Sequence, residues 1–473
     1  METHPTEMSQ GENDYEKDLK HLTSTIAGKI SEGAEKAEYF FSSACIFRVP
    51  EDLRKLNERA YTPRLIVIGP LHREDEHLQT PLQHVKLSYT NYLLSRLTAG
   101  MKDPQELVEQ TKLRVLQECL AEMKTSLDYA KKCYAEEVTL DEEMMLVDSC
   151  FILEFLYRCR TLEVPESDPI FCNSMAFYKV QNDLVLLENQ IPFFVLEKLF
   201  RLTVDRIPNH CNENWSLTDY VRNCYRFWMM PRRNSNNSGS AESTWCSPSD
   251  GVLRVLAAAE EVVVVVQSAA KYYHILHNLH DGYIPPLDQT NREKPSEIVV
   301  MPSASELACA GVKFVPDALG NTLFNIKFIE PKGLFWWCRS ACFVIPPLVI
   351  EDSTESYLRN LIALEQCCPG VLQHVSSYAW LMDILVNSDK DIQVLEKAGV
   401  VINFLGTSEA SALLSKLCKQ CYIGNYFLDT AIKATEYSNR FWRQNLALLT
   451  STYFNSPWTF ITFCVGFIAF VIS

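Results

Sequence analysis

The stretch Asp183-Leu-Val-Leu-Leu-Glu-Asn-Gln-Ile-Pro-Phe193 places three consecutive polar residues between an apolar run and a proline. Pro192 has no amide hydrogen and disfavours a helical conformation for the residue before it, so we predict that one helix ends near Asn189 and another begins at Pro192. The side chains of Glu188, Asn189 and Gln190 would then satisfy free carbonyl groups at the first helix end or cap the second helix. A ligand or partner site is the alternative.

Helical patterns surround this stretch. Asp103-Pro104-Gln105-Glu106 combines a capping residue, a proline in the first turn and a carboxylate, which predicts a helix reaching toward Lys132. Further helices are predicted from 141 to about 160 and from 175 toward 199. Residues 231–250 are polar and of low complexity, which indicates a flexible surface loop.

The second half of the chain changes its periodicity twice. Residues 252–279 are apolar without Pro or Gly and predict a helix, whereas 311–350 alternate in hydrophobicity between Pro and Gly turns and predict a small antiparallel sheet. Helical patterns return from Thr354 and continue to about 421, with a stop at Pro369-Gly370. The predicted fold class is mainly α (α+β), a helix-rich globular body with a small antiparallel β-sheet and one C-terminal transmembrane helix.

Three parts of the chain are distinguished by composition. Leu19, Leu22, Ile26 and Ile30 recur at helical spacing and predict an amphipathic helix that docks on the body or on a partner. The parts are an N-terminal polar tail with this helix (1–40), a helix-rich body (41–445) and a C-terminal membrane anchor (456–473).

The anchor prediction depends on the uncharged run from Trp458 to Ile472. Fifteen residues cover about 23 Å as a helix, against about 30 Å for the hydrocarbon layer, so a buried hairpin or core helix is the alternative. Basic residues precede the run and no signal peptide is predicted, which favours a single-pass protein with a cytosolic body, the plasma membrane being one candidate. The residues assigned to the anchor are Trp458, Phe460, Ile461, Phe463, Val465, Phe467, Ile468, Phe470 and Val471.

Composition excludes one class of partner. A net charge of −15 and a pI near 5.2 argue against nucleic-acid binding, which needs a basic surface. The 17 cysteines are an odd number and are scattered, so we expect most of them to be reduced and buried. Glycosylation sequons at Asn214 and Asn236 support the alternative of a lumenal body.

An ordered series of motifs resembles one plant family. The motifs are Cys45-Ile-Phe-Arg-Val-Pro50, Ala60-Tyr-Thr-Pro-Arg64, Ile68-Gly-Pro-Leu-His72, Val147-Asp-Ser-Cys-Phe-Ile-Leu-Glu154, the 183–193 stretch, Ser303-Ala-Ser-Glu-Leu307, Gly311-Val-Lys-Phe314, Ile345-Pro-Pro-Leu348, Asn360-Leu-Ile-Ala-Leu-Glu-Gln366 and Asn455-Ser-Pro-Trp458. From about 40 to 473 the chain is similar to the domain of unknown function 247 family. The resemblance implies a helix-rich body with one C-terminal span, and some members are implicated in pollen recognition at grass self-incompatibility loci. It implies no chemistry.

Candidate ligand clusters are few. His72, His77 and His84 lie near acidic residues and could hold a divalent cation, although a charged loop is the simpler interpretation. His274, His277 and His280 recur every third residue, which is too divergent on a helix for one ion, so a solvated helix edge is predicted. The cysteines of Cys418-Lys-Gln-Cys421 are predicted to lie on one helical turn, without zinc or redox context.

No catalytic motif is found, so we expect neither an enzyme nor a cofactor or metal. The residues Phe335, Trp336, Trp337 and Arg339 either pack in the core or contact a partner. We therefore predict a membrane-anchored recognition or signalling component that acts through protein contacts, with an unidentified protein partner and an oligomeric state that the sequence does not define. The alternatives are a membrane-tethered hydrolase-like enzyme with an atypical site and a lumen-facing receptor.

Overall fold

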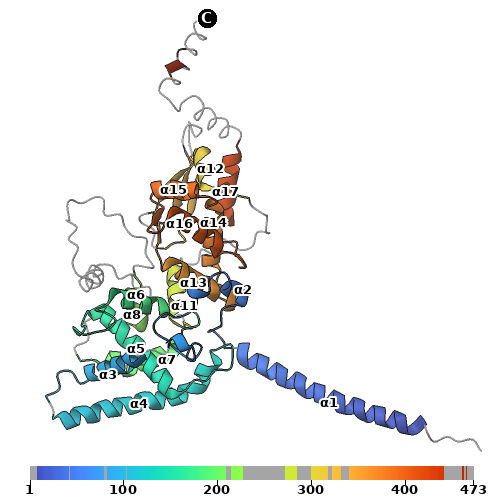
Figure 1. Ribbon diagram of the computed structural model, residues 1–473, viewed down its shortest axis with the longest axis vertical. Coiled ribbons are helices and arrows are strands. Elements are labelled where there is room, and N and C mark those ends of the chain that lie inside the picture. Colours follow the sequence, from blue (N-terminus) through green and yellow to red (C-terminus); the bar gives the residue numbers. More distant parts are fainter. Residues whose placement is uncertain are drawn as a thin grey trace, which may run out of the picture.

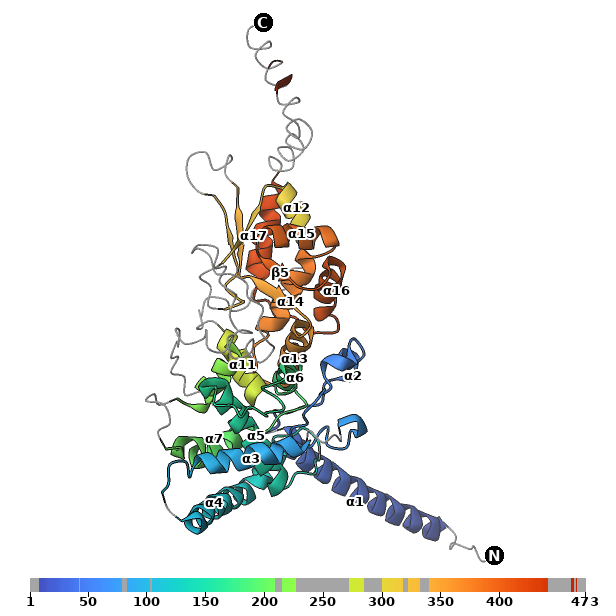
Figure 2. The same cartoon turned by 60° about the vertical axis from the view of Figure 1, so that its left-hand side comes forward.

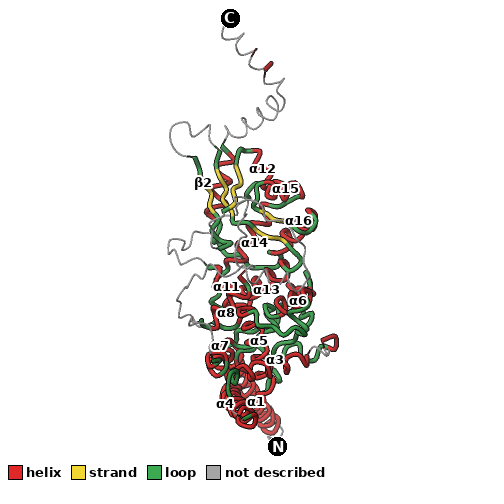
Figure 3. Tube along the Cα trace, turned by 90° about the vertical axis from the view of Figure 1, so that its left-hand side faces the viewer, coloured by secondary structure: helices red, strands yellow, loops and turns green. Residues whose placement is uncertain are grey.

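A computed structural model describes most of the chain. The described residues are 8–41, 43–78, 83–102, 104–208, 215–226, 272–284, 300–317, 322–331, 340–440, 461–462 and 465. Helices dominate these residues, as predicted, and the strands gather toward one end of an elongated body (Figure 3).

The other end of the body is a helical lobe built around α5 (Glu142–Thr161). Four helices pack on α5 (Figure 1), namely α3 (Gln83–Arg96), α4 (Gln105–Lys132), α7 (Phe193–Leu202) and α8 (Leu217–Cys224). Because α5 is covered on nearly all sides, residues such as Phe151 and Phe155 are fully buried. The Asp141 carboxylate caps the helix by accepting the amide hydrogen of Met144 at 2.7 Å.

A second lobe holds the strands and most of the later helices (Figure 2). Its helices are α12 (Ala304–Cys309), α14 (His374–Leu385), α15 (Asp389–Lys397), α16 (Thr407–Leu417) and α17 (Leu428–Asn439). Helices α11 (Ile275–Tyr283) and α13 (Thr354–Cys367) pack on each other between the lobes, α11 contacting α8 and α13 contacting α14. Short elements complete the described part, namely α2 (Glu51–Arg54), α6 (Ser174–Asp183), η1 (Glu58–Ala60), η2 (Glu76–Leu78) and η3 (Val204–Arg206).

The described strands form two small sheets, and the antiparallel sheet predicted for 311–350 is only partly right, because one pairing within that range is antiparallel and one is parallel. In the first sheet, β3 (Cys342–Ile345) is central, parallel to β1 (Lys313–Pro316) and antiparallel to β2 (Lys327–Ile329). In the second sheet, β4 (Leu348–Ile350) is parallel to β5 (Val401–Asn403). Parallel pairs need a crossover between strands, and the helices between residues 350 and 401 supply one.

Several predicted helix ends agree with the structure and one does not. Helix α4 begins at Gln105 after Pro104 and ends at Lys132, and α7 begins directly after Pro192, as predicted. The helix predicted to continue to Asn189 ends at Asp183 instead. The predicted loop at 231–250 and most of the predicted 252–279 helix lie outside the described residues.

Helix α1 (Met8–Phe41) confirms the predicted N-terminal helix but does not lie along the body (Figures 1 and 2). Every described side chain from 15 to 37 is exposed, including Leu22 and Ile26 of the apolar stripe. In the structure, the apolar stripe of α1 therefore does not dock on the body.

The predicted transmembrane helix is not supported and is corrected. Among the described residues, no helix is both long and apolar enough to cross a membrane. Of 456–473, only Ile461, Thr462 and Val465 are described, and the other assigned anchor residues lie outside the described part. The uncharged run was already short for a bilayer, at about 23 Å against about 30 Å.

Candidate functional site

The stretch 183–193 is the point where distant segments of the helical lobe meet. The buried Asp183 carboxylate accepts three successive backbone amide hydrogens, from Arg64 at 2.8 Å, Leu65 at 2.7 Å and Ile66 at 2.9 Å. Burial raises the pKa of Asp183 to about 6, although these three donors favour the charged form. Asp183 thus supplies the hydrogen-bond acceptor for the amides of the extended segment 64–66, which pairs with no strand among the described residues.

Asn189 and Gln190 have structural roles of the same kind. The Asn189 side chain accepts the amide hydrogen of Ile68 at 2.7 Å and donates to the carbonyls of Ile66 at 3.0 Å and Asp183 at 2.8 Å. Gln190 donates to two carbonyls just beyond the end of α6, both at 2.8 Å. The prediction that these side chains satisfy free carbonyls is confirmed. The prediction that Asn189 or Gln190 caps α7 is wrong, because the N-cap residue is Pro192 and no side-chain capping hydrogen bond forms there.

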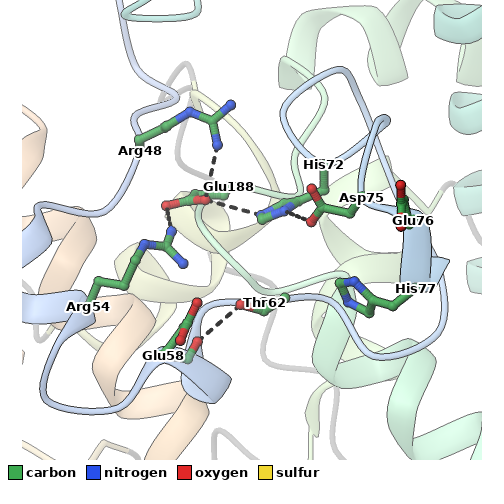
Figure 4. A pocket seen from close by; sticks show the side chains of 9 residues that line it. All are labelled: Arg48, Arg54, Glu58, Thr62, His72, Asp75, Glu76, His77 and Glu188. Atoms are coloured by element: carbon green, nitrogen blue, oxygen red, sulfur yellow. Dashed lines mark hydrogen bonds and ion pairs between the residues drawn. The ribbon is translucent and has the colours of Figure 1, made fainter.

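Glu188 differs from its neighbours because its carboxylate lies at a pocket (Figure 4). Its side chain is fully buried and accepts the amide hydrogen of Val49 at 2.6 Å. Arg54 pairs with the same oxygen, while the other oxygen lies 3.1 Å from Nε2 of His72 and 3.8 Å from Nη1 of Arg48. Burial alone would raise the pKa of Glu188, but the hydrogen bonds and the nearby positive charges hold it below its usual value.

The pocket has a volume of about 460 Å³ and is polar. Its nine lining residues are Arg48, Arg54, Glu58, Thr62, His72, Asp75, Glu76, His77 and Glu188. Nδ1 of His72 lies 2.8 Å from Asp75, so this imidazole is held between two carboxylates. Arg48 is also bound to Glu136 at 2.8 Å and donates to the Leu71 carbonyl at 3.1 Å. The arginines and His72 are therefore already engaged in the folded protein.

This pocket brings together residues that the sequence treated separately. His72 and His77, which were considered as metal ligands, line it, whereas His84 is exposed on α3. Among the described residues, no group of three or more His, Cys, Asp or Glu side chains is arranged to hold a metal ion. The sequence missed the role of Glu188 because its partners come from positions more than 100 residues earlier.

The second histidine set is arranged differently from the prediction. His274 and His280 are buried, so the predicted solvated helix edge is wrong. Nε2 of His274 bonds the Cys45 carbonyl at 3.1 Å, and Nε2 of His280 bonds Glu365 at 2.7 Å. The two rings thus serve separate partners. Burial lowers the pKa of His274 to about 3, which keeps its ring neutral.

Other predicted sites fall partly outside the described residues. Phe335, Trp336, Trp337 and Arg339 are not described, and their role stays a prediction. The sequons at Asn214 and Asn236 are also outside the described residues. Cys418 and Cys421 follow the end of α16 at Leu417, so their prediction as one helical turn is wrong.

A buried ion network within the helical lobe was missed by the sequence analysis. Arg158 on α5 is fully buried, pairs with Asp168, and donates to Glu154 at 2.7 Å. Its guanidinium lies over the rings of Tyr89 at 4.1 Å and Tyr92 at 4.7 Å. Polar residues inside the apolar run of α5 were the available signal. The network holds α5 to α3 and to the loop that contains Asp168.

The fold and these contacts define the class of protein. It is a helix-rich protein in which polar side chains of one motif, such as Asp183 and Asn189, hydrogen-bond the backbone of other motifs. The chain belongs to a plant family, because the DUF247 model, described as plant protein of unknown function, matches residues 46–472. The resemblance seen in the motifs is thereby confirmed.

Two relatives from Arabidopsis thaliana are similar over most of their lengths. UPF0481 protein At3g47200 is 26% identical over 459 residues, which cover 93% of this chain and 88% of that protein. Putative UPF0481 protein At3g02645 is 22% identical over 493 residues, which cover 88% and 86% respectively. No solved structure matches the chain.

Proposed function

We propose that this protein is a recognition or signalling component that acts through protein contacts, with the apolar stripe of α1 as its contact surface. The observation that carries the proposal is the exposure of this stripe: Leu19, Leu22, Ile26 and Ile30 are 49%, 54%, 47% and 67% exposed. Four large aliphatic side chains at helical spacing are costly to leave in water without a partner.

The spacing fits a second helix. Tyr15, Leu19, Leu22 and Ile26 are separated by steps of four, three and four residues, and Ile30 lies eleven residues after Leu19. An eleven-residue repeat, at about 3.67 residues per turn, drifts slowly around a straight helix, so a partner helix that follows the stripe would wind around α1 with a right-handed supercoil. Helix-in-groove or helix–helix recognition uses such anchors.

Charge favours a different protein over a second copy. The sequence from 12 to 18 has four carboxylates and one lysine, the segment 20–29 has two lysines and no carboxylate, and 32–38 has three carboxylates and one lysine. Two copies, parallel or antiparallel along their full lengths, would place acidic segments against each other. We therefore commit to a partner helix with an apolar face, basic ends and an acidic middle.

The test uses two synthetic peptide helices with the same apolar face. One carries Lys at its ends and Glu in its middle, and the other carries the reverse pattern. We expect the full chain to bind the first peptide at least tenfold more tightly. The double variant Leu22→Glu with Ile26→Glu should lose this binding, whereas Ser24→Glu with Ser31→Glu, which adds the same charge off the stripe, should lose less than threefold.

Three results would overturn the proposal. Equal binding of both peptides would show that charge does not select the partner. Equal loss of binding in the two double variants would show that the stripe is not the contact surface. Light scattering that shows a stable dimer, abolished by the stripe variant alone, would assign the stripe to a second copy of the chain. A partner captured from plant tissue supports the proposal only if its purified form shows the same dependence on the stripe.

A further inference from the structure

Two buried sulfur atoms lie against each other where α8 packs on α5. Sγ of Cys159 on α5 is 3.1 Å from Sγ of Cys224, the last residue of α8. Both residues are buried, and both are free thiols in the structure. A disulfide bond measures about 2.05 Å, so the sulfurs need to approach by only about 1 Å to bond.

The surroundings hold the two sulfurs face to face. Gln181 donates from Nε2 to the Cys224 carbonyl at 3.1 Å and lies 3.7 Å from its sulfur. Earlier in the same two helices, the rings of Tyr157 and Tyr220 stack with centroids 6.4 Å apart. At the other end of α8, the Ser216 capping box fixes the start of the helix. The pair is thus positioned by contacts on both sides and by the helix cap.

We propose that Cys159 and Cys224 are a redox-active pair that closes an intramolecular disulfide between α5 and α8 when it meets an oxidised low-molecular-weight disulfide such as oxidised glutathione. One cysteine thiolate attacks the glutathione disulfide and displaces a glutathione thiolate, which takes up a proton. The second thiolate then attacks the mixed disulfide and releases a second glutathione. The two thiols lose two electrons and two protons in total, and one oxidised glutathione becomes two reduced ones.

Burial determines how the reaction starts. Removal from water, together with the contact to Cys224, raises the pKa of the Cys159 thiol well above its usual value. The thiolate is therefore scarce while α8 is seated, and we expect attack to follow local opening of this eight-residue helix. Closure then joins positions 65 residues apart.

The test oxidises the full-length reduced chain in glutathione buffers of increasing oxidised fraction. After an acid quench and alkylation in denaturant, peptide mass spectrometry measures each cysteine and each cross-linked pair. We expect the Cys159–Cys224 link to rise more than tenfold over the fully reduced sample, with both thiols lost together. Cys159→Ser or Cys224→Ala should abolish the link, and Cys150→Ser, at a buried cysteine on the same helix, should leave it intact.

A parallel series at low urea, below the main unfolding transition, promotes opening of α8. The proposal is overturned if both cysteines remain fully alkylated in both series. It is also overturned if either cysteine pairs mainly with a different residue. A link that forms only in the urea series supports the pairing and shows that opening limits its rate.

Discussion

Replacing Asn189 by leucine tests how much the 183–193 stretch contributes to the fold. The two side chains are similar in size, but leucine cannot replace the bonds to Ile68, Ile66 and Asp183. The Ile68 amide and the Ile66 carbonyl would lose these partners, at about 1–3 kcal/mol each, and the Asp183 carbonyl would keep only the longer bond from the Leu186 amide at 3.4 Å. Allowing for some relaxation, we expect Asn189→Leu to lower the free energy of unfolding by about 3–6 kcal/mol.

Urea unfolding followed by circular dichroism measures this loss through the transition midpoint and slope. The matched control is Asn182→Leu, because the Asn182 side chain makes a local bond to the Tyr178 carbonyl at 2.8 Å. Its expected cost is about 0.5–1.5 kcal/mol. A loss below about 1 kcal/mol for Asn189→Leu, or equal losses for the two variants, would refute the assignment of 183–193 as the structural hub.

Three further changes test neighbouring contacts. Burial raises the pKa of Asp183 from 3.8 to about 6, so its contribution to the free energy of unfolding should fall by about 2 kcal/mol as pH rises from 4 to 7, and Asp183→Asn should remove that slope in urea titrations. Gly69→Ala should cost more than about 1 kcal/mol in thermal unfolding, because φ is +69° and the new Cβ would lie 2.7 Å from the Gln190 carbonyl oxygen. Arg158→Met should cost about 3–5 kcal/mol in urea unfolding, because it leaves the buried Asp168 carboxylate without its cation, whereas Glu154 keeps its pair with Arg96, and an effect below 1 kcal/mol would contradict this.

Local signals in the sequence predicted local structure well. The start of α4 after Pro104, the start of α7 after Pro192 and the apolar stripe of α1 each depend on residues within a few turns. The end of α6 was missed because Asp183 and Asn189 bind the distant segment 64–68, and this tertiary gain outweighs helix propensity.

Non-local pairings could not be read from the pattern. Strand β5 begins at Val401, more than 50 residues after its partner β4, and alternation gives no direction of pairing. The burial of His280 depends on its hydrogen bond with Glu365, which lies 85 positions later in the chain. The contacts of Glu188 likewise come from residues 48–72. The family resemblance correctly identified the segments involved but contained no geometry.

The most direct test of the account is hydrogen exchange on the purified full-length chain, which reports whether α1 has a partner. A lone helix in water opens readily, whereas the amides of α5 are covered by four other helices. We predict that amides of residues 15–37 exchange at least a hundredfold faster than those of α5, and that the peptide with basic ends slows them at least tenfold. Protection of 15–37 in the monomer without any peptide would show that the stripe is already covered by the chain itself, and would contradict the proposed function.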